Sequence, residues 1–276
     1  MQLMKRFKKK KKVMAVLEIN EAIDASPERY GGKGGTLGML DFLYDYLDED
    51  ERIDGLLLRM NTPGGTAGAS EELAQLIARL KEERTIPVVA TIADLCCSGG
   101  YMIACAADAI YANRGSMTGS IGCILQIPNV EGLSEKIGVT YVTIKSGRMK
   151  DIGNPTRKMT EEERTYLESF AKETHDAFIA HVTKHRPQIK NTEEMFDGRP
   201  VGAVLAKENE LIDAFGGYYD AYEDLLQRMG EEDDKNIEVH EFKRKKTLVQ
   251  KIMGTMAPFS MGNILQGFLE SHLAIK

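Results

Sequence analysis

The sequence has no long apolar run, no histidine in its first 174 residues and only four cysteines. A helix that spans a bilayer needs about 18 to 20 apolar residues, so the chain is expected to be soluble and cytoplasmic. The cysteines lie on apolar segments within 28 residues and lack Cys-x-x-Cys spacing, which argues against a disulfide framework and against a zinc site. They are Cys96, Cys97, Cys105 and Cys123.

Basic residues are fewer than acidic residues outside the N-terminus. Seven of the 36 lysines and arginines lie in residues 1–12, where there is no acid, so 29 basic residues face 42 acidic ones in the rest of the chain. This acidic excess argues against nucleic acid as a partner. We interpret residues 1–12 as a disordered basic tip. The alternative is peripheral contact with the anionic inner face of a membrane.

Segments typical of strands and helices alternate along the chain, which predicts an α/β fold with a parallel sheet. The organisation predicted is a basic tip over 1–12, one domain over 13–230, and a charged linker with an apolar Met-rich tail over 231–276. A Thr160/Glu163 capping box predicts the start of a long helix that ends before Pro187. Strands are expected at 13–19, 54–60, 87–93, 109–112 and 139–144, and shorter helices near 40–47, 73–80, 101–107 and 130–137.

The segment Cys97-Ser98-Gly99-Gly100-Tyr101 joins the expected strand 87–93 to the expected helix 101–107. A serine at this junction lies at a helix N-terminus, where free N–H groups favour a developing negative charge. The glycines allow close approach of backbone or substrate. This arrangement is suited to a nucleophile. The alternative is a serine N-cap followed by glycines that pack the helix.

A second glycine turn, Asn61-Thr62-Pro63-Gly64-Gly65, also follows an expected strand. The carboxyl ends of parallel strands lie at one edge of a sheet, so the two turns are expected to be neighbours. Acyl transfer needs N–H donors for the oxyanion, and this turn and Gly99 could each supply one. The alternative is a turn that merely tolerates glycine.

A serine nucleophile needs a base, and no histidine is tied to Ser98 by the sequence. Two of the three in the expected long helix share a face, which suggests a metal pair, but solvent-facing side chains explain the pattern better. A lysine can act as the base when its pKa is lowered by burial. Lys150, on a glycine-flanked loop, is the best candidate, and Lys145 and Lys158 are alternatives. The histidines are His175, His181, His185, His240 and His272.

Four blocks of the sequence stand out together: residues 58–65 (LRMNTPGG), 97–101 (CSGGY), 118–122 (TGSIG) and 146–151 (SGRMKD). In their order and spacing the chain resembles the short, single-repeat bacterial form of signal peptide peptidase A, over about residues 13–230. Residues 197–217 are similar to the closing segment of that family. Cys96-Cys97 and Asn209-Glu210 depart from its pattern, and we expect a packed thiol pair and a peripheral change.

The resemblance implies a Ser/Lys dyad peptidase with a fold related to the Clp proteolytic subunit and the crotonases. Ser98 would be the nucleophile, Lys150 the general base and Ser120 the residue that orients the lysine, while Gly65 and Gly99 would form the oxyanion hole. No cofactor or metal is implied. Members form ring-like homo-oligomers in which neighbouring subunits complete the site, and they cleave signal-peptide remnants and unfolded, hydrophobic peptides. Two alternatives are an inert ring scaffold that binds peptides and a crotonase-type acyl-CoA enzyme.

Overall fold

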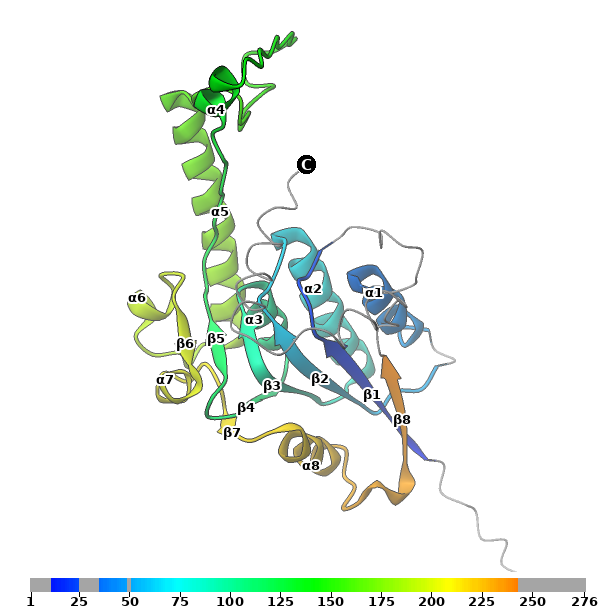
Figure 1. Ribbon diagram of the computed structural model, residues 1–276. Helices are drawn as coiled ribbons and strands as arrows, with labels where there is room; N and C mark the ends of the chain where they lie inside the picture. The colour runs from blue at the N-terminus through cyan, green and yellow to red at the C-terminus, as the bar shows by residue number, and fades with distance from the viewer. Residues whose placement is uncertain (1–10, 25–34, 49–50, 243–276) are drawn as a thin grey trace, which may run out of the picture.

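The computed structural model describes residues 11–24, 35–48 and 51–242, and Figure 1 shows their arrangement. Residues 1–10 and 243–276 lie outside the described residues, so what is predicted for most of the basic tip and for the Met-rich tail stays a prediction. The strands described are β1 (Lys12–Ile19), β2 (Gly55–Thr62), β3 (Val88–Cys97), β4 (Ala109–Ala112), β5 (Met117–Gly119), β6 (Pro200–Gly202), β7 (Ala214–Phe215) and β8 (Ile237–Phe242). The α-helices are α1 (Gly35–Asp45), α2 (Ala67–Arg84), α3 (Gly99–Ala104), α4 (Glu131–Lys136), α5 (Glu161–His185), α6 (Thr192–Met195), α7 (Ala203–Glu208) and α8 (Tyr218–Arg228).

The strands form one sheet in the order β6-β5-β3-β2-β1-β8, with β4 and β7 beside the first half of β3. The described strands pair in parallel, except that β5 and β6 are antiparallel. Residues 89–92 of β3 pair with β4, and residues 95–97 pair with β5. The end of β3 is therefore flanked by β2 on one side and β5 on the other. The expected α/β fold with a parallel sheet is confirmed.

Helices cover both faces of this sheet, because alternate side chains of a strand point to opposite faces. Ala15 and Leu17 of β1 belong to the core that α1, α2 and α3 cover. Met14 and Val16 belong to a second cluster, which α8 covers with Leu225 and its neighbours. Figure 1 shows α8 on the side opposite α1 and α2. The near-continuous apolar strands follow from this burial on two faces.

A long arm projects from the sheet. The arm consists of residues 122–160 and the first three turns of α5, and Figure 1 shows it extending well beyond the strands. The predicted capping box is present at the start of α5, where Thr160 and Glu163 bind each other's backbone N–H groups. Phe178 and Val182 of α5 are buried, whereas Phe170, nearer the start of the helix, is exposed. Only the second half of α5 packs on the core.

Two predictions about the chain's organisation differ from the structure. Residues 139–144 do not form a strand, and Ile144 is 96% exposed. Their apolar character indicates burial, but nothing within one copy of the described chain covers them. The domain also continues past residue 230, because β8 pairs with β1 over residues 237–242. Within the described residues, no helix is both long and apolar enough to cross a membrane.

Candidate active site

Ser98 is held in an unusual backbone conformation between β3 and α3, with φ 52° and ψ −125°. A non-glycine residue in such a region costs about 1–3 kcal/mol and persists only where surrounding contacts hold it. Here the Ser98 N–H donates to the carbonyl oxygen of Gly119 at 2.8 Å. The Ser98 side chain makes no capping hydrogen bond. Ser98 thus occupies the N-cap position of α3 without capping the helix through its side chain. Backbone strain of this kind is typical of functional residues.

The two glycine turns predicted to be neighbours meet at Ser98. A Cβ placed on Gly64 would lie 2.8 Å from Ser98 Cβ, and Gly64 itself has φ 97°. A Cβ placed on Gly99 would lie 3.5 Å from the backbone nitrogen of Gly65 and only 2.0 Å from Ser70 Oγ. A side chain at Gly64 would therefore force the two turns apart, and one at Gly99 would clash with α2. The structure brings Ser98, Gly65 and Gly99 together at one edge of the sheet.

Ser120 lies on the other side of Ser98, one residue after β5. It also has a positive φ, 53°, and its N–H donates to Arg199 O at 3.0 Å. Its Oγ donates to Gly198 O at 3.1 Å, which leaves the oxygen's lone pairs for a further donor. The segment around Gly198 thus packs against Ser120. The structure brings Ser120 close to Ser98 through the bond between Ser98 N and Gly119 O.

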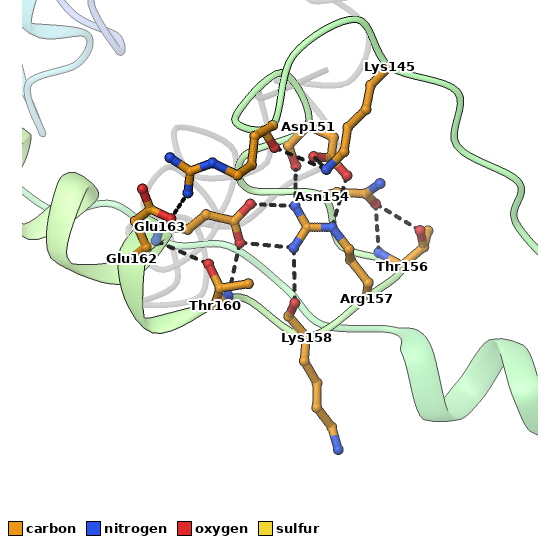
Figure 2. Close-up of polar contacts among 10 residues, drawn as sticks. Lys145, Asp151, Asn154, Thr156, Arg157, Lys158, Thr160, Glu162 and Glu163 are labelled. Atoms are coloured by element: carbon orange, nitrogen blue, oxygen red, sulfur yellow. Dashed lines mark hydrogen bonds and ion pairs between the residues drawn. The ribbon is translucent and has the colours of Figure 1, made fainter.

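Lys150 does not join this group within one copy of the chain. It is exposed in the arm, next to Asp151, whose carboxylate is linked through Arg157 to Glu163 in the first turn of α5 (Figure 2). The helix that follows Ser98, α3, contacts α5 through the hydrogen bond between His181 and Met102 O. His181 lies 18 residues after Glu163 along α5. At about 1.5 Å per residue this separation is about 27 Å. Ser98 and Lys150 therefore lie towards opposite ends of α5.

The chain matches a family model described as peptidase family S49 over residues 80–231, more than half its length. The chain belongs to peptidase family S49. The matched residues include Ser98, Ser120 and Lys150, whereas the turn at Gly65 precedes them. The resemblance stated for the four sequence blocks is thereby confirmed at the level of the family.

The relatives of this S49 chain include putative proteases of bacteria and of an archaeon. A putative protease of Methanocaldococcus jannaschii is 39% identical over 186 residues, which cover 67% of this chain and 59% of the relative. A putative signal peptide peptidase SppA of Enterococcus faecium is 38% identical over 180 residues, 65% of this chain and 52% of the relative. A putative protease of Synechocystis sp. is 35% identical over 207 residues, 75% of this chain and 74% of the relative. The S49 chain thus spans little more than half the length of the first two.

A solved structure shares the fold of the S49 chain. It is a mutant of a membrane-bound stomatin-specific protease in complex with a substrate peptide, and it is 14% identical with a TM-score of 0.50. The match covers 89% of this chain and 98% of that one. At this identity the likeness concerns the fold alone.

The three histidines on α5 of the S49 chain do not face solvent as predicted. His181 Nε2 lies 2.9 Å from Met102 O, and His175 Nε2 lies 3.0 Å from Ile121 O. His185 packs against His181, and burial lowers the pKa of His185 to about 4. These side chains face α3 and the segment after Ser120. Among the described residues, no three His, Cys, Asp or Glu side chains gather in a way that could hold a metal ion.

The thiols beside Ser98 are packed side chains. Cys96 and Cys97 are fully buried, and desolvation raises the pKa of Cys97 to about 12. A thiol with so high a pKa is a poor nucleophile and a poor redox sensor.

The change at Asn209-Glu210 also has a structural correlate. Glu210 adopts a positive φ of 62°, a conformation that a glycine adopts without strain.

The three candidate lysines differ in their surroundings. The Lys145 amine binds Asp151 Oδ1 at 2.5 Å and Arg148 O at 3.0 Å, and such partners favour the protonated form. Within the described chain, neither the Lys150 nor the Lys158 amine has a hydrogen bond, and Figure 2 shows Lys158 pointing away from the ion-pair network. Arg157 has no role in the predictions made from the sequence. The sequence feature that could have pointed to Arg157 is the capping box. Arg157 lies three residues before Thr160 and binds Glu163, the buried glutamate of that box.

Proposed function

We propose that this chain is a serine endopeptidase that uses Ser98 as its nucleophile. The observation that carries the proposal is the strained Ser98 at the β3–α3 junction, with Gly65 and Gly99 beside it. In a chain of peptidase family S49, this geometry suits hydrolysis of a peptide bond. The N–H groups of Gly65 and Gly99 would stabilise the oxyanion, and each such donor contributes about 3–4 kcal/mol to a transition state.

The general base in this proposal is Lys150 of a neighbouring copy. Lys150 lies too far along the arm to reach Ser98 of its own chain, so a complete dyad requires a second copy. The arm exposes apolar side chains suited to a contact between copies, among them Ile144 and Val142, which is 83% exposed. Such a contact, repeated head to tail, closes into a ring. The proposal therefore includes a ring-shaped homo-oligomer.

The chemistry then proceeds in two steps. The neutral Lys150 amine takes the Ser98 Oγ proton as Oγ bonds to the substrate carbonyl carbon, and the protonated amine gives its proton to the leaving nitrogen as the peptide bond breaks. A water molecule, deprotonated by Lys150, next attacks the acyl-enzyme and releases Ser98. Ser120, near Ser98, would accept a hydrogen bond from the amine and so aim its lone pair. No cofactor takes part in either step.

The substrates proposed are unfolded or hydrophobic peptides, including signal-peptide remnants. The name of the Enterococcus faecium relative supports this substrate class. A peptide must also enter the site as an extended chain, since the reacting groups line the narrow edge of a sheet. The basic tip, if it contacts anionic lipid, would bring the site close to such remnants.

The test compares wild-type protein with Ser98→Ala, Lys150→Ala and the matched control Lys158→Ala on fluorogenic apolar peptides. We expect the first two variants to lose cleavage and the control to keep it. Mixing Ser98→Ala with Lys150→Ala should restore part of the activity, because some sites then combine an intact serine with an intact lysine. Normal cleavage by either single variant contradicts the dyad. Equal, negligible turnover by all variants would favour a peptide-binding scaffold, or acyl-CoA chemistry if the protein binds acyl-CoA.

A further inference from the structure

Arg157 is the centre of a hydrogen-bond network in the arm (Figure 2). Its Nε donates to Asp151 Oδ2 at 2.9 Å and its Nη2 to Asp151 O at 3.1 Å. Its Nη1 donates to Lys158 O at 3.0 Å and to Glu163 Oε2 at 2.9 Å, and its Nη2 also binds Glu163 Oε1. A guanidinium has five N–H groups in a fixed plane. All five N–H groups of Arg157 have an acceptor here, and only an arginine side chain has this many donors.

One side of the network is the rigid start of α5. Glu163 accepts from Thr160 N at 2.9 Å and donates its own N–H to Thr160 Oγ1 at 3.2 Å, which completes the capping box. The Glu163 side chain is 3% exposed. The Arg157 guanidinium beside it lowers the pKa of Glu163 to about 2. The carboxylate therefore stays charged at neutral pH, and Arg157 is anchored to a helix end.

The other side of the network is the loop that carries Lys150. Arg157 binds both the backbone carbonyl and the carboxylate of Asp151, the residue that follows Lys150. On the preceding side, Lys145 donates to Arg148 O at 3.0 Å, and the Lys150 N–H donates to Gly147 O at 3.1 Å. The backbone is thus fixed on both sides of Lys150. Its amine, by contrast, has no hydrogen-bond or ion-pair partner in the described chain.

Asp151 is the nearest carboxylate in sequence to that amine, yet both of its oxygens are occupied by other cations. Oδ2 accepts from Arg157, and Oδ1 accepts from Lys145 at 2.5 Å. These hydrogen bonds, that from Arg157 first, hold the pKa of Asp151 well below its usual range. A lysine paired with a carboxylate keeps its proton more firmly and is a weaker base. The network keeps Asp151 away from Lys150.

We propose that Arg157 is a positioning residue for Lys150, which fixes the lysine loop to the first turn of α5 and keeps Asp151 from pairing with the lysine amine. This inference rests on the proposed function, since it assigns Lys150 the role of base. Arg157 touches neither the substrate nor Ser98 and acts only through the loop. Its replacement should therefore change how well Lys150 accepts a proton, not how well the site binds peptide.

The first test is the pH profile of Arg157→Lys, which keeps the charge but has three donors in place of five. We expect kcat to fall about 10- to 100-fold through misplacement of the base, with KM nearly unchanged. Because Asp151 is then free to pair with Lys150, the acidic limb of kcat/KM should move up by about one pH unit. The matched control is Arg164→Lys, since Arg164 lies near the start of α5, seven residues after Arg157, and has only a long contact of 3.8 Å with Glu161.

The second test places the substitution in one chain of a mixed assembly. In mixtures of Ser98→Ala with Lys150→Ala, the active sites take their lysine from the Ser98→Ala chain. Arg157→Lys added to that chain should remove most of the restored activity. The same change added to the Lys150→Ala chain should leave it intact. Thermal midpoints and assembly masses measured in parallel show whether each variant is folded.

The outcomes separate this inference from the proposed function. A wild-type pH limb and kcat in Arg157→Lys, or equal losses from both placements, overturns the positioning role, because a purely structural arginine would act in either chain. A loss of kcat at every pH without a shift in the limb overturns it as well. Failure of the parent mixture to regain activity, together with a shifted limb, contradicts sharing of the dyad between copies and leaves the role of Arg157 supported.

Discussion

His181 of α5 and Met102 of α3 are joined by a hydrogen bond of 2.9 Å between Nε2 and the Met102 carbonyl. His175 makes a matching contact with Ile121 O at 3.0 Å, next to Ser120. The second half of α5 thereby holds the two segments that flank the Ser98 turn, while its first turn holds the lysine loop. One continuous helix therefore sets the distance between the two halves of the proposed dyad.

The half-buried histidine pair, His181 and His185, should make stability depend on pH. The pKa of His185 is lowered to about 4, mainly by burial, whereas an unfolded histidine has a pKa of about 6.5. Between these values the unfolded state binds more protons than the folded state, so the free energy of unfolding should fall as the pH drops from about 6.5 to about 4. Urea denaturation at several pH values should show a shallower dependence in His185→Gln. A slope equal to that of the wild type would assign the effect to other groups.

Gly99→Ala should destabilise the protein through a contact with α2. The added Cβ would lie 2.0 Å from Ser70 Oγ and 2.7 Å from Ser70 Cβ, and such overpacking costs about 1–3 kcal/mol. Ser70→Gly removes both atoms, so the double variant should lose less stability than the two single variants combined. Gly68→Ala, which meets nothing within 4 Å, is the control. Strict additivity in denaturation experiments would refute the contact.

The thiols around Ser98 should resist alkylation in the native protein. The pKa values of Cys97 and Cys105 are raised to about 12 by desolvation, and only the thiolate reacts readily. Iodoacetamide at pH 8 should therefore leave Cys96, Cys97 and Cys105 unmodified in native protein and label them in urea. Peptide mass spectrometry locates the label. Rapid native labelling of Cys97 would contradict its burial and indicate a reactive thiol beside Ser98.

The exposed apolar side chains of the arm should be required for assembly and for activity. Ile144→Asp changes a residue that is 96% exposed, and a surface substitution alters the stability of a single copy by only about 0.5 kcal/mol. We expect a smaller assembly, lost peptide cleavage and an unchanged circular dichroism spectrum. Tyr219→Asp, at a 78% exposed position on α8, should leave all three unchanged. Full assembly of Ile144→Asp would exclude this part of the arm from the contact between copies.

Sequence patterns predicted the elements whose signals are local. The apolar periodicity of α2, with Leu73, Ile77 and Leu80 buried, and the capping box of α5 both lie within a few residues of the elements they define. The meeting of the Gly65 and Gly99 turns followed from the general position of strand ends in parallel sheets. These features needed no knowledge of distant contacts.

Other features depend on partners far away in the sequence. The pattern around His181 predicts a solvent-facing side chain. Its partner, Met102, lies 79 residues earlier, so no local pattern reveals their contact. The positive φ of Ser98 is imposed by contacts such as that with Gly119 O, and no local preference of serine predicts it. The apolar run at residues 139–144 predicts a buried strand. Such a run indicates that the segment is covered, but it does not indicate whether the same chain or another copy covers it.

The hydrogen bond from the buried Tyr101 hydroxyl to Leu211 O, 2.8 Å long, has a consequence for synthesis. Tyr101 lies in α3 directly after the Ser98 turn, and its partner is added to the chain 110 residues later. His181, which holds the next residue of α3, also follows late. A nascent chain on the ribosome therefore contains Ser98 long before α3 can gain its full set of contacts. The order in which the polypeptide is made delays completion of the Ser98 turn until most of the domain has been translated.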